Sequence, residues 1–488
     1  MKFTLTPFEF FVLRTRTRFP FKYGIASLTD VPQFFVTTRV ADGRGEQTGL
    51  AAEGLPPKWF TKDPATTFEQ DLPQMTDVVT HAAGLAVKIA RTPIGFFDLW
   101  VELNRQQTSW AESRRVAPLL AHLGVSLVER AVLDGLCRLA GEPLHQMVRA
   151  NRLGLRLGEI YPELGSAQPA ELLPSAPLEM TRVRHTVGLA DALTPTDLAI
   201  EDRVTDGLPQ DLEASIRAYG LQYFKVKLFG DPERDFPRLR RIVPLLEHET
   251  SGQWHVTLDG NETFHDFAAF RGYWEAARAE PALSGLWSHV IVVEQPVHRD
   301  HALSDEVGRA LGAWAERPPI ILDESDGAVG DVPRAISLGY AGASHKNCKG
   351  IVKGIANAAF LRLQHGREAP PVLTGEDLCI LGPVALLQDL AMMALLGISH
   401  VERNGHHYYR GLSMLPASWQ GAILDSHDDI YRSHQDGFAC LRIEGGRLDL
   451  RSVNAAPFGV APTLDPSSFQ RFEGDPAPPS RRLGEVAG

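Results

Sequence analysis

The sequence predicts an α/β protein, a (β/α)8 TIM-type barrel with a separate α+β capping domain. Short apolar runs alternate with amphipathic, helix-like segments from Arg182 to Arg403, and they amount to eight strands over about 230 residues, close to the ~250 typical of such a barrel. Five of these runs end in charged side chains at steps of 23 to 35 residues, the length of one strand, one helix and two loops.

Composition limits the class of protein. The 488 residues are 44% hydrophobic and 22% charged, which indicates a folded protein long enough for more than one domain. The net charge of -11 argues against a nucleic-acid partner, since phosphate binding needs a basic face. The four cysteines are widely spaced and indicate neither a disulfide framework nor a structural zinc site. Because the longest apolar run, Leu390 to Ile398, is far shorter than the ~20 residues of a membrane helix, we expect a cytoplasmic protein without membrane contact.

The first 150 residues form the predicted capping domain. β-Branched and aromatic runs indicate strands, and later apolar periodicity indicates helices, so this part is an α+β unit. The expected elements are strands over Phe8–Leu13 and Gln33–Val40, a loop over Phe19–Ser27, and helices over Thr67–Ala90 and Trp110–Leu139. Residues 151–181 contain several prolines without clear periodicity and are expected to be a connecting insertion.

Residues 182–412 form the predicted barrel. Continuous apolar strands flanked by amphipathic helices indicate a parallel sheet covered on both faces, with one shared cleft at the carboxyl ends of the strands. The expected strands are Arg182–Gly188, Tyr223–Phe229, His255–Asn261, Val290–Pro296, Pro319–Ser325, Ala341–Asn347, Pro371–Gly375 and Ser399–Arg403. Residues 413–474 are expected to return to the cap, with a hairpin that turns at Gly445–Gly446, and the Pro-rich, polar residues 475–488 to be a mobile tail.

The charged strand ends suggest a metal site. Strands four apart in order face each other across a barrel, so Lys227 on the second strand opposes Lys346 on the sixth. Asp259, Glu294 and Asp323, on strands three to five, then lie between the two lysines. Three converging carboxylates with no cations between them would repel one another, and a hard divalent cation is the usual remedy. Magnesium is the first choice, because carboxylate oxygens are the ligands it prefers.

The lysines suggest acid/base chemistry. A protonated lysine is a poor base, but Lys225, two residues before Lys227 on the same face, would together with the metal favour the neutral amine of Lys227. The proton that this amine could best remove lies α to a carboxylate, provided that a metal stabilises the resulting enediolate. Lys346 could return a proton or stabilise the anion. The substrate would then be a small carboxylate molecule.

With these residues in place, the chain resembles the enolase superfamily, and within it the mandelate racemase and muconate lactonizing enzyme branch. The resemblance covers nearly the whole chain and rests on motifs in the family's order: Lys225-x-Lys227, Asp259-x-Asn261, Glu294-Gln-Pro296, Asp323-Glu324-Ser325 and Lys346. It implies that Asp259, Glu294 and Asp323 bind Mg²⁺ and that Lys227 and Lys346 form the acid/base pair. It also implies that Lys225 and Glu324 support these groups and that cap loops near Phe21–Ala26 and Glu53–Trp59 select the substrate.

Several positions depart from the family pattern or leave roles open. Lys349-Gly350 stands where the family commonly has a Gly-Gly pair after the sixth-strand lysine, so Lys349 competes with Lys346 for that role. Val401-Glu402-Arg403 replaces the Asp-x-Asp of dipeptide epimerases, which disfavours that activity. Glu376 and Glu402 end strands seven and eight and either face the pocket or pair with an arginine. Asn261 is expected to shape the site rather than react.

The leading hypothesis is a magnesium-dependent racemase or epimerase, or a cycloisomerase, that abstracts the proton α to a carboxylate. Opposed lysines disfavour the dehydratases that use a histidine on a later strand, and a proton carrier on each face makes racemase or epimerase the first choice. A syn β-elimination of the o-succinylbenzoate synthase kind is the alternative. Two further hypotheses are a retired barrel that serves as a binding protein and a Schiff-base aldolase that uses one of the lysines. We also expect a homo-oligomer.

Overall fold

Eight parallel strands close into a barrel in the computed structural model, which describes residues 1–364 and 371–473. The last strand pairs with the first, as the fold prediction requires, and this confirms the barrel. The strands are β6 (Met180–Val187), β7 (Tyr223–Lys227), β8 (His255–Asp259), β9 (Val290–Glu294), β10 (Ile320–Leu322), β11 (Gly342–His345), β12 (Val372–Gly375) and β13 (His400–Arg403). Lys227 is the register partner of Asp259, and Asp259 that of Glu294, so neighbouring strands end at one level.

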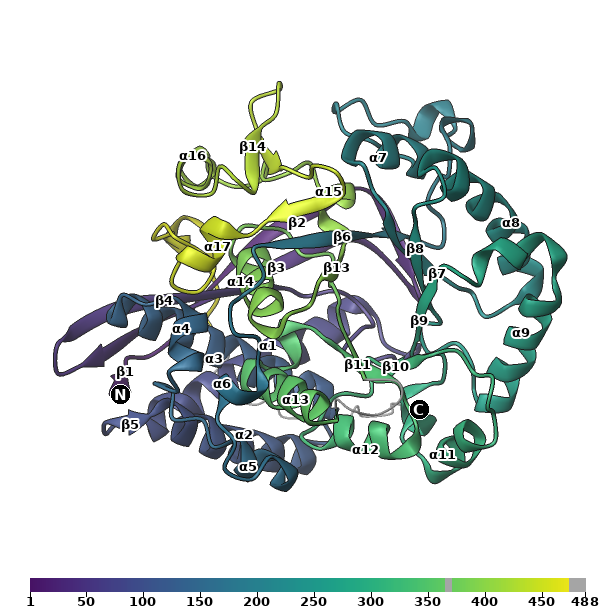
Figure 1. The fold of residues 1–488 in the computed structure, drawn as a ribbon. Coiled ribbons are helices and arrows are strands. Elements are labelled where there is room, and N and C mark those ends of the chain that lie inside the picture. Colours follow the sequence, from purple (N-terminus) through teal and green to yellow (C-terminus); the bar gives the residue numbers. More distant parts are fainter. Residues whose placement is uncertain (365–370, 474–488) are drawn as a thin grey trace, which may run out of the picture.

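Helices cover the outside of the barrel, and Figure 1 shows several of them as an arc around the strands. Asp211, Asp231, Asp266 and Ser304 accept backbone N–H groups at helix N-termini, which explains where four of the helices begin. The helices are α7 (Leu212–Tyr219), α8 (Pro232–Glu249), α9 (Phe267–Ala279), α10 (Arg299–Ala302), α11 (Asp305–Gly312), α12 (Asp331–Leu338), α13 (Ile351–Leu363), α14 (Val384–Leu396) and α15 (Gly405–Tyr408), with short 3-10 turns η2 (Pro195–Asp197), η3 (Ile200–Asp202), η4 (Pro281–Leu286) and η5 (Asn347–Lys349) between them.

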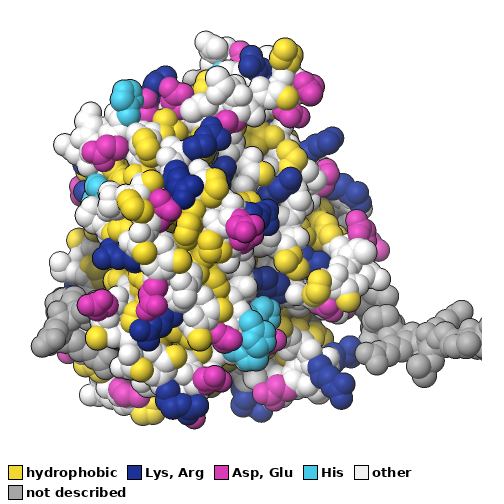
Figure 2. Space-filling view, turned by 90° about the vertical axis from the view of Figure 1, so that its right-hand side faces the viewer, with side chains coloured by type: hydrophobic (Ala, Val, Ile, Leu, Met, Phe, Trp, Pro, Cys, Tyr) yellow, Lys and Arg dark blue, Asp and Glu magenta, His cyan; other side chains and the backbone are white. Residues whose placement is uncertain are grey.

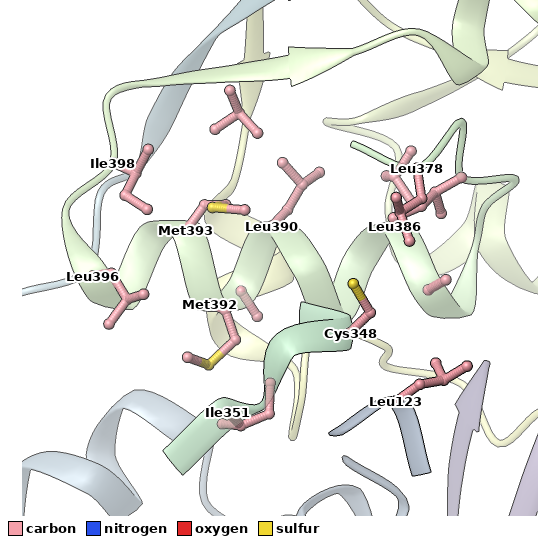
Figure 3. Packing of buried hydrophobic residues seen from close by; sticks show 14 of the residues in the cluster. Leu123, Cys348, Ile351, Leu378, Leu386, Leu390, Met392, Met393, Leu396 and Ile398 are labelled. Atoms are coloured by element: carbon pink, nitrogen blue, oxygen red, sulfur yellow. The ribbon is translucent and has the colours of Figure 1, made fainter. Parts of the chain in front are cut away.

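The apolar helix α14 is buried at every one of its residues. Figure 3 shows its side chains, among them Leu390 and Met392, packed near Cys348 and Ile351 from the segment that follows β11. Leu123 of the cap lies in the same cluster. This packing joins the barrel to the cap beneath the loop that carries Lys346.

The capping domain combines an antiparallel sheet with helices. Its elements are β1 (Lys2–Leu5), β2 (Glu9–Tyr23), β3 (Ala26–Asp42), β4 (Gly45–Gly54), β5 (Ile94–Gly95), α1 (Phe68–Ile89), α2 (Phe96–Arg114), α3 (Pro118–Ala140) and α4 (Leu144–Arg149). The predicted loop over Phe19–Ser27 is wrong, since β2 and β3 continue through it and turn at Gly24. The single predicted helix over Trp110–Leu139 is also wrong, because left-handed Arg115 ends α2 and Pro118 begins α3.

Residues 151–181, the expected insertion, form short helices that pack on the barrel. They are α5 (Leu157–Ile160), η1 (Pro162–Leu164) and α6 (Pro169–Leu172). The hydroxyl of Tyr161 donates to Asn357 Oδ1 in α13 at 2.6 Å, and its ring contacts Phe360. The segment is therefore attached to the barrel by buried contacts.

The C-terminal segment returns to both domains. It contains α16 (Ala417–Ser426), β14 (Tyr431–Ser433), β15 (Ala439–Leu441), β16 (Arg447–Asp449), α17 (Arg451–Ala455), η6 (Pro466–Ser468) and β17 (Gln470–Arg471). The chain turns at Gly445–Gly446 as predicted, and Glu444 and Arg447 form an antiparallel bridge across this turn. The predicted hairpin does not extend further, because β15 pairs with β14 and β16 pairs with barrel strand β6. β17 pairs with cap strand β2. The predicted tail, residues 475–488, lies outside the described residues.

Charges of both signs cover the surface. On the face shown in Figure 2, basic and acidic side chains are interspersed, with hydrophobic atoms between them. All four cysteines are buried and unpaired. In the described parts of the chain, none of the helices combines the length and apolar character needed to cross a membrane.

Candidate active site

A row of three buried carboxylates lies at the mouth of the barrel. Asp259 and Glu294 are the last residues of β8 and β9 and are register partners, and Asp323 directly follows β10. All three are 1% exposed. Burial, followed by the negative charges of Asp259 and Glu376, raises the pKa of Glu294 well above its ordinary value. The predicted ligand set therefore lies together, and its members repel one another electrostatically.

Lys225 lies among these carboxylates. Its Nζ is 3.0 Å from Asp259 Oδ2, 2.8 Å from Glu294 Oε1, 2.7 Å from Glu376 Oε2 and 3.0 Å from Glu402 Oε2. Burial acts to lower the pKa of Lys225, but these four negative charges raise it well above the ordinary value. The expectation that no cation lies between the carboxylates is therefore wrong.

Lys227 and Lys346 lie at the two ends of the row. Lys227 Nζ is 2.5 Å from Asp259 Oδ2, and Lys346 Nζ is 2.6 Å from Asp323 Oδ2 and 4.7 Å from the centre of the Trp59 ring. Burial acts to lower the pKa of Lys346, but the negative charge of Asp323 outweighs it and the pKa is raised. Lys346 is thus held as an ammonium ion between a carboxylate and an aromatic ring of the cap.

Lys349 occupies the other side of Asp323. Its Nζ is 2.8 Å from Asp323 Oδ1 and donates to the hydroxyl of Ser344, which also donates to Asp323. Burial acts to raise the pKa of Asp323, but Lys346 and Lys349 lower it well below its ordinary value. Lys346 lines the cavity of the site and Lys349 does not, so only Lys346 is placed to meet a ligand.

Glu376 and Glu402 have structural partners. Arg184 pairs with Glu376, and Thr374 donates to the same carboxylate at 2.6 Å. Thr186 donates to Glu402 Oε1 at 2.7 Å, while Lys225 occupies its other oxygen. Glu376 thus pairs with an arginine, one of the two open possibilities, whereas Glu402 lines the cavity. The sequence reasoning missed Arg184, because a conventional strand arginine carries no motif that would single it out.

Asn261 and Glu324 also line the cavity. The backbone N–H of Asn261 donates to Asp259 Oδ1 at 2.8 Å, and this residue has a φ of 44°, so its side chain turns away from the strand direction. Burial, followed by the charge of Asp323, raises the pKa of Glu324 to about 8. Asn261 Oδ1 and Glu324 Oε2 are buried and accept no hydrogen bond from the described residues. Buried polar atoms without partners at a cavity are the groups that a ligand would satisfy.

The cap closes this cavity. Phe21, Tyr23, Pro56 and Trp59 form its outer wall, and the barrel supplies three lysines and four carboxylates, among them Asp323. The predicted cap loops thus lie over the mouth, although the first of them is a strand end. The cavity volume is about 30 Å³, room for a water molecule or two, so a substrate requires displacement of the cap side chains.

The donor set fits a hard divalent cation by its chemistry, since three buried carboxylates supply the oxygen ligands that Mg²⁺ prefers. In the described chain, however, no three Asp, Glu, His or Cys side chains are arranged around one metal position. The ammonium groups of Lys225, Lys227 and Lys346 lie against the same oxygens. A cation would have to replace some of these ion pairs, and the assignment of the three ligands stays a prediction.

The architecture defines a capped (β/α)8 barrel with carboxylates and lysines at the carboxyl ends of its strands. Comparison with solved structures places this fold. The muconate lactonizing enzyme of Pseudomonas fluorescens, complexed with muconolactone, superposes with a TM-score of 0.57 at 17% identity and covers 96% of this chain and 99% of its own. The dipeptide epimerase of Methylococcus capsulatus, complexed with Mg and the dipeptide L-Arg-D-Lys, gives a TM-score of 0.52 at 17% identity, over 92% of this chain and 100% of its own.

The chain therefore has the fold of mandelate racemase and muconate lactonizing enzymes, as the resemblance drawn from the motifs implied. No family model matches the chain. Among curated proteins it is 31% identical over 172 residues to the L-Lys-D/L-Arg epimerase of Methylococcus capsulatus, a match over 31% of this chain. The match spans 45% of that relative, less than half its length. These neighbours are enzymes.

Proposed function

We propose that this chain is an enolase-superfamily enzyme that removes the proton α to the carboxylate of a small molecule and returns it, as a racemase or epimerase. One observation carries the proposal. Lys227 and Lys346 lie at opposite ends of one buried row of carboxylates, and both line the same cavity. A substrate carbon between them would have a proton carrier on each face.

Asp259, Glu294 and Asp323 would hold the divalent cation, for which we propose Mg²⁺. When bound, this cation supplies positive charge that lowers the free energy of an anion formed next to a carboxylate. Support comes from the burial of Glu294, which together with the charges of Asp259 and Glu376 raises its pKa, and from the Mg in the complex of the neighbouring dipeptide epimerase structure.

Each of the two lysines would carry out one of the two proton-transfer steps. Lys227 takes the proton on one face, and Lys346, held as an ammonium ion by Asp323, donates on the other. Trp59 and the other cap aromatics exclude water around the transfer. The racemase would work in the opposite direction with the roles exchanged.

The substrate would differ from the dipeptide of the curated relative. Both oxygens of Glu402 are occupied, by Thr186 and Lys225, so this carboxylate is not available to a substrate ammonium group. A small carboxylate with an apolar body suits the aromatic wall of the cap. Cycloisomerisation or syn elimination would use the same α-proton chemistry with one lysine as the base.

The test is deuterium exchange from D₂O into a library of amino-acid derivatives and hydroxy acids, followed by NMR in the presence of Mg²⁺. We expect exchange by the wild type at the α-carbon of at least one compound. Lys227→Ala should lose exchange from one enantiomer and Lys346→Ala from the other, each by more than a hundredfold. Lys353→Met, a buried lysine away from the cavity, is the matched control and should exchange at the wild-type rate.

Other outcomes separate the alternatives. Exchange that yields a lactone or an alkene would identify a cycloisomerase or a syn dehydratase. Activity that survives EDTA, together with borohydride trapping of a lysine, would instead support the Schiff-base aldolase. If no compound exchanges and Mg²⁺ binds no more tightly than to Asp259→Ala, the enzyme proposal is rejected in favour of a binding protein.

A further inference from the structure

The site contains nearly as many cations as carboxylates. In the described chain, ion pairs at the mouth of the barrel join five buried carboxylates to five buried cationic side chains, and the carboxyl group of Glu324 lies beside them. The paired groups are Asp259, Glu294, Asp323, Glu376 and Glu402, with Arg184, Lys225, Lys227, Lys346 and Lys349. A divalent cation that binds among these side chains is repelled by the positive charges of the lysines and the arginine.

Lys349 is the cation whose position has no role in the proposed reaction. It is 1% exposed, does not line the cavity, and its Nζ lies 2.8 Å from Asp323 Oδ1. Its nearest neighbours besides Asp323 are the hydroxyl and carbonyl oxygens of Ser344. Lys346 can leave Asp323 for a ligand, because it faces the cavity. Lys349 has no such space and stays beside the carboxylate.

We infer that Lys349 weakens divalent-cation binding to the substrate-free protein by holding a positive charge against one oxygen of Asp323. The inference rests on one part of the proposed function, the role of Asp323 as a ligand of the divalent cation. Two like charges a few ångströms apart in a buried site repel each other, because the site screens them less than bulk water does. Removal of the lysine charge would therefore raise the affinity of the site for the cation.

The chain supplies a matched control. Lys353 follows Lys349 by four residues, is equally buried, and its Nζ is 2.8 Å from Asp326 Oδ1, whose other oxygen lies 4.0 Å from Lys349 Nζ. Asp326 is not among the proposed ligands. Ser344→Ala is a second control, because it removes a hydrogen bond to Asp323 without changing the charge.

The experiment is calorimetric titration of Mg²⁺ into the full chain without substrate, repeated with Mn²⁺ by loss of the free-ion electron paramagnetic resonance signal. Lys349→Met and Lys349→Gln should each bind at least tenfold more tightly than the wild type. Lys353→Met and Ser344→Ala should stay within about threefold of it. Circular dichroism verifies the fold of each variant.

Equal or weaker binding by the folded Lys349 variants would overturn the inference, and so would an equal gain in Lys353→Met. Loss of the fold in both Lys349 variants would also overturn it, since the charge would then serve the fold. If no protein binds either ion, the proposed metal site and the inference fail together. If the affinities change as expected while no α-carbon exchanges deuterium, the proposed function fails and the inference stands.

Discussion

Single charged residues in this protein act according to the partners that surround them. Lys225 and Lys227 are two positions apart on one strand and both line the cavity, yet Lys225 is enclosed by four carboxylates whereas Lys227 contacts one. The histidines show the same dependence. His427 is buried, accepts a hydrogen bond from the backbone N–H of Ala461 at its Nε2, and contacts Ser452 Oγ through Nδ1 at 2.8 Å. Because Ser452 donates its own proton to Asp429, the Nδ1 of His427 is the donor and its ring is neutral.

This arrangement predicts a pH-dependent stability. Burial lowers the pKa of His427 from 6.5 to about 4. The unfolded chain takes up this proton near pH 6.5 and the folded chain only near pH 4, so its contribution to stability is present above pH 6.5 and is lost as the pH falls through that window. The loss amounts to at most about 3 kcal/mol.

Urea unfolding of the wild type and His427→Gln from pH 7 to pH 4 measures this contribution. The free energy of unfolding of the variant should be lower at pH 7, and the difference should close as the pH falls. A difference that is the same at both ends of the range would contradict the assignment of a neutral His427.

At the scale of elements, helix α3 is the part of the cap that approaches its neighbours most closely. A Cβ at Gly124 would lie 2.1 Å from the carbonyl oxygen of Val78 in α1. A Cβ at Gly49 of β4 would lie 1.8 Å from the carbonyl oxygen of Ala131 in α3. These contacts are between backbones, so no side-chain movement can relieve them. The two glycines therefore fix how closely α3 packs on α1 and on the sheet.

A pair of glycine substitutions tests this packing. Gly124→Ala should destabilise the protein by about 3 kcal/mol or more, because the added methyl overlaps the backbone of α1. Gly84→Ala, at an exposed position of α1 with no atom within 4 Å of the added Cβ, should instead be neutral or stabilising by up to ~1 kcal/mol. Thermal unfolding of both variants gives the comparison. Equal destabilisation of the two variants would contradict the close contact at Gly124 as the cause, because helix propensity favours alanine at both positions.

At the scale of the whole molecule, the cap holds the loop that carries Lys346. Glu129 of α3 accepts the backbone N–H groups of Ile351 and Val352 at the start of α13, and Ser126 donates to the carbonyl oxygen of Asn347. These contacts join residues more than 200 positions apart. The cap thus closes the cavity from above through Trp59 and fixes one of its lysines from the side through α3.

Glu129→Ala should therefore affect both stability and the proposed activity. Loss of two hydrogen bonds from a buried carboxylate to a helix N-terminus should cost about 2–4 kcal/mol. The loop should also become less ordered, so deuterium exchange on the Lys346 face should fall more than exchange on the Lys227 face. Ser126→Ala, which removes a single bond, should cost about 1 kcal/mol. An equal loss of exchange on both faces would show that Glu129 serves the fold in general.

The sequence determined the barrel and the list of charged residues at its mouth. Strand–helix alternation placed all eight barrel strands, and the positions of Asp259, Glu294 and Asp323 at strand ends followed, because parallel strands end at one edge. The strand–helix period is a local property of the sequence and repeats along the chain, so the barrel strands can be predicted without knowledge of tertiary contacts. The opposed positions of Lys227 and Lys346 followed from strand order alone.

Only the tertiary structure decided which charge meets which. Lys225 among four carboxylates, Lys349 behind Asp323, and Arg184 on Glu376 depend on side-chain reach across strands that lie tens to hundreds of residues apart. The pairing of β15 with β14 and of β16 with β6 likewise depends on which strand edges lie close together in space. Electrostatic pairing and edge pairing depend on distances in space, and spacing along the chain does not encode them.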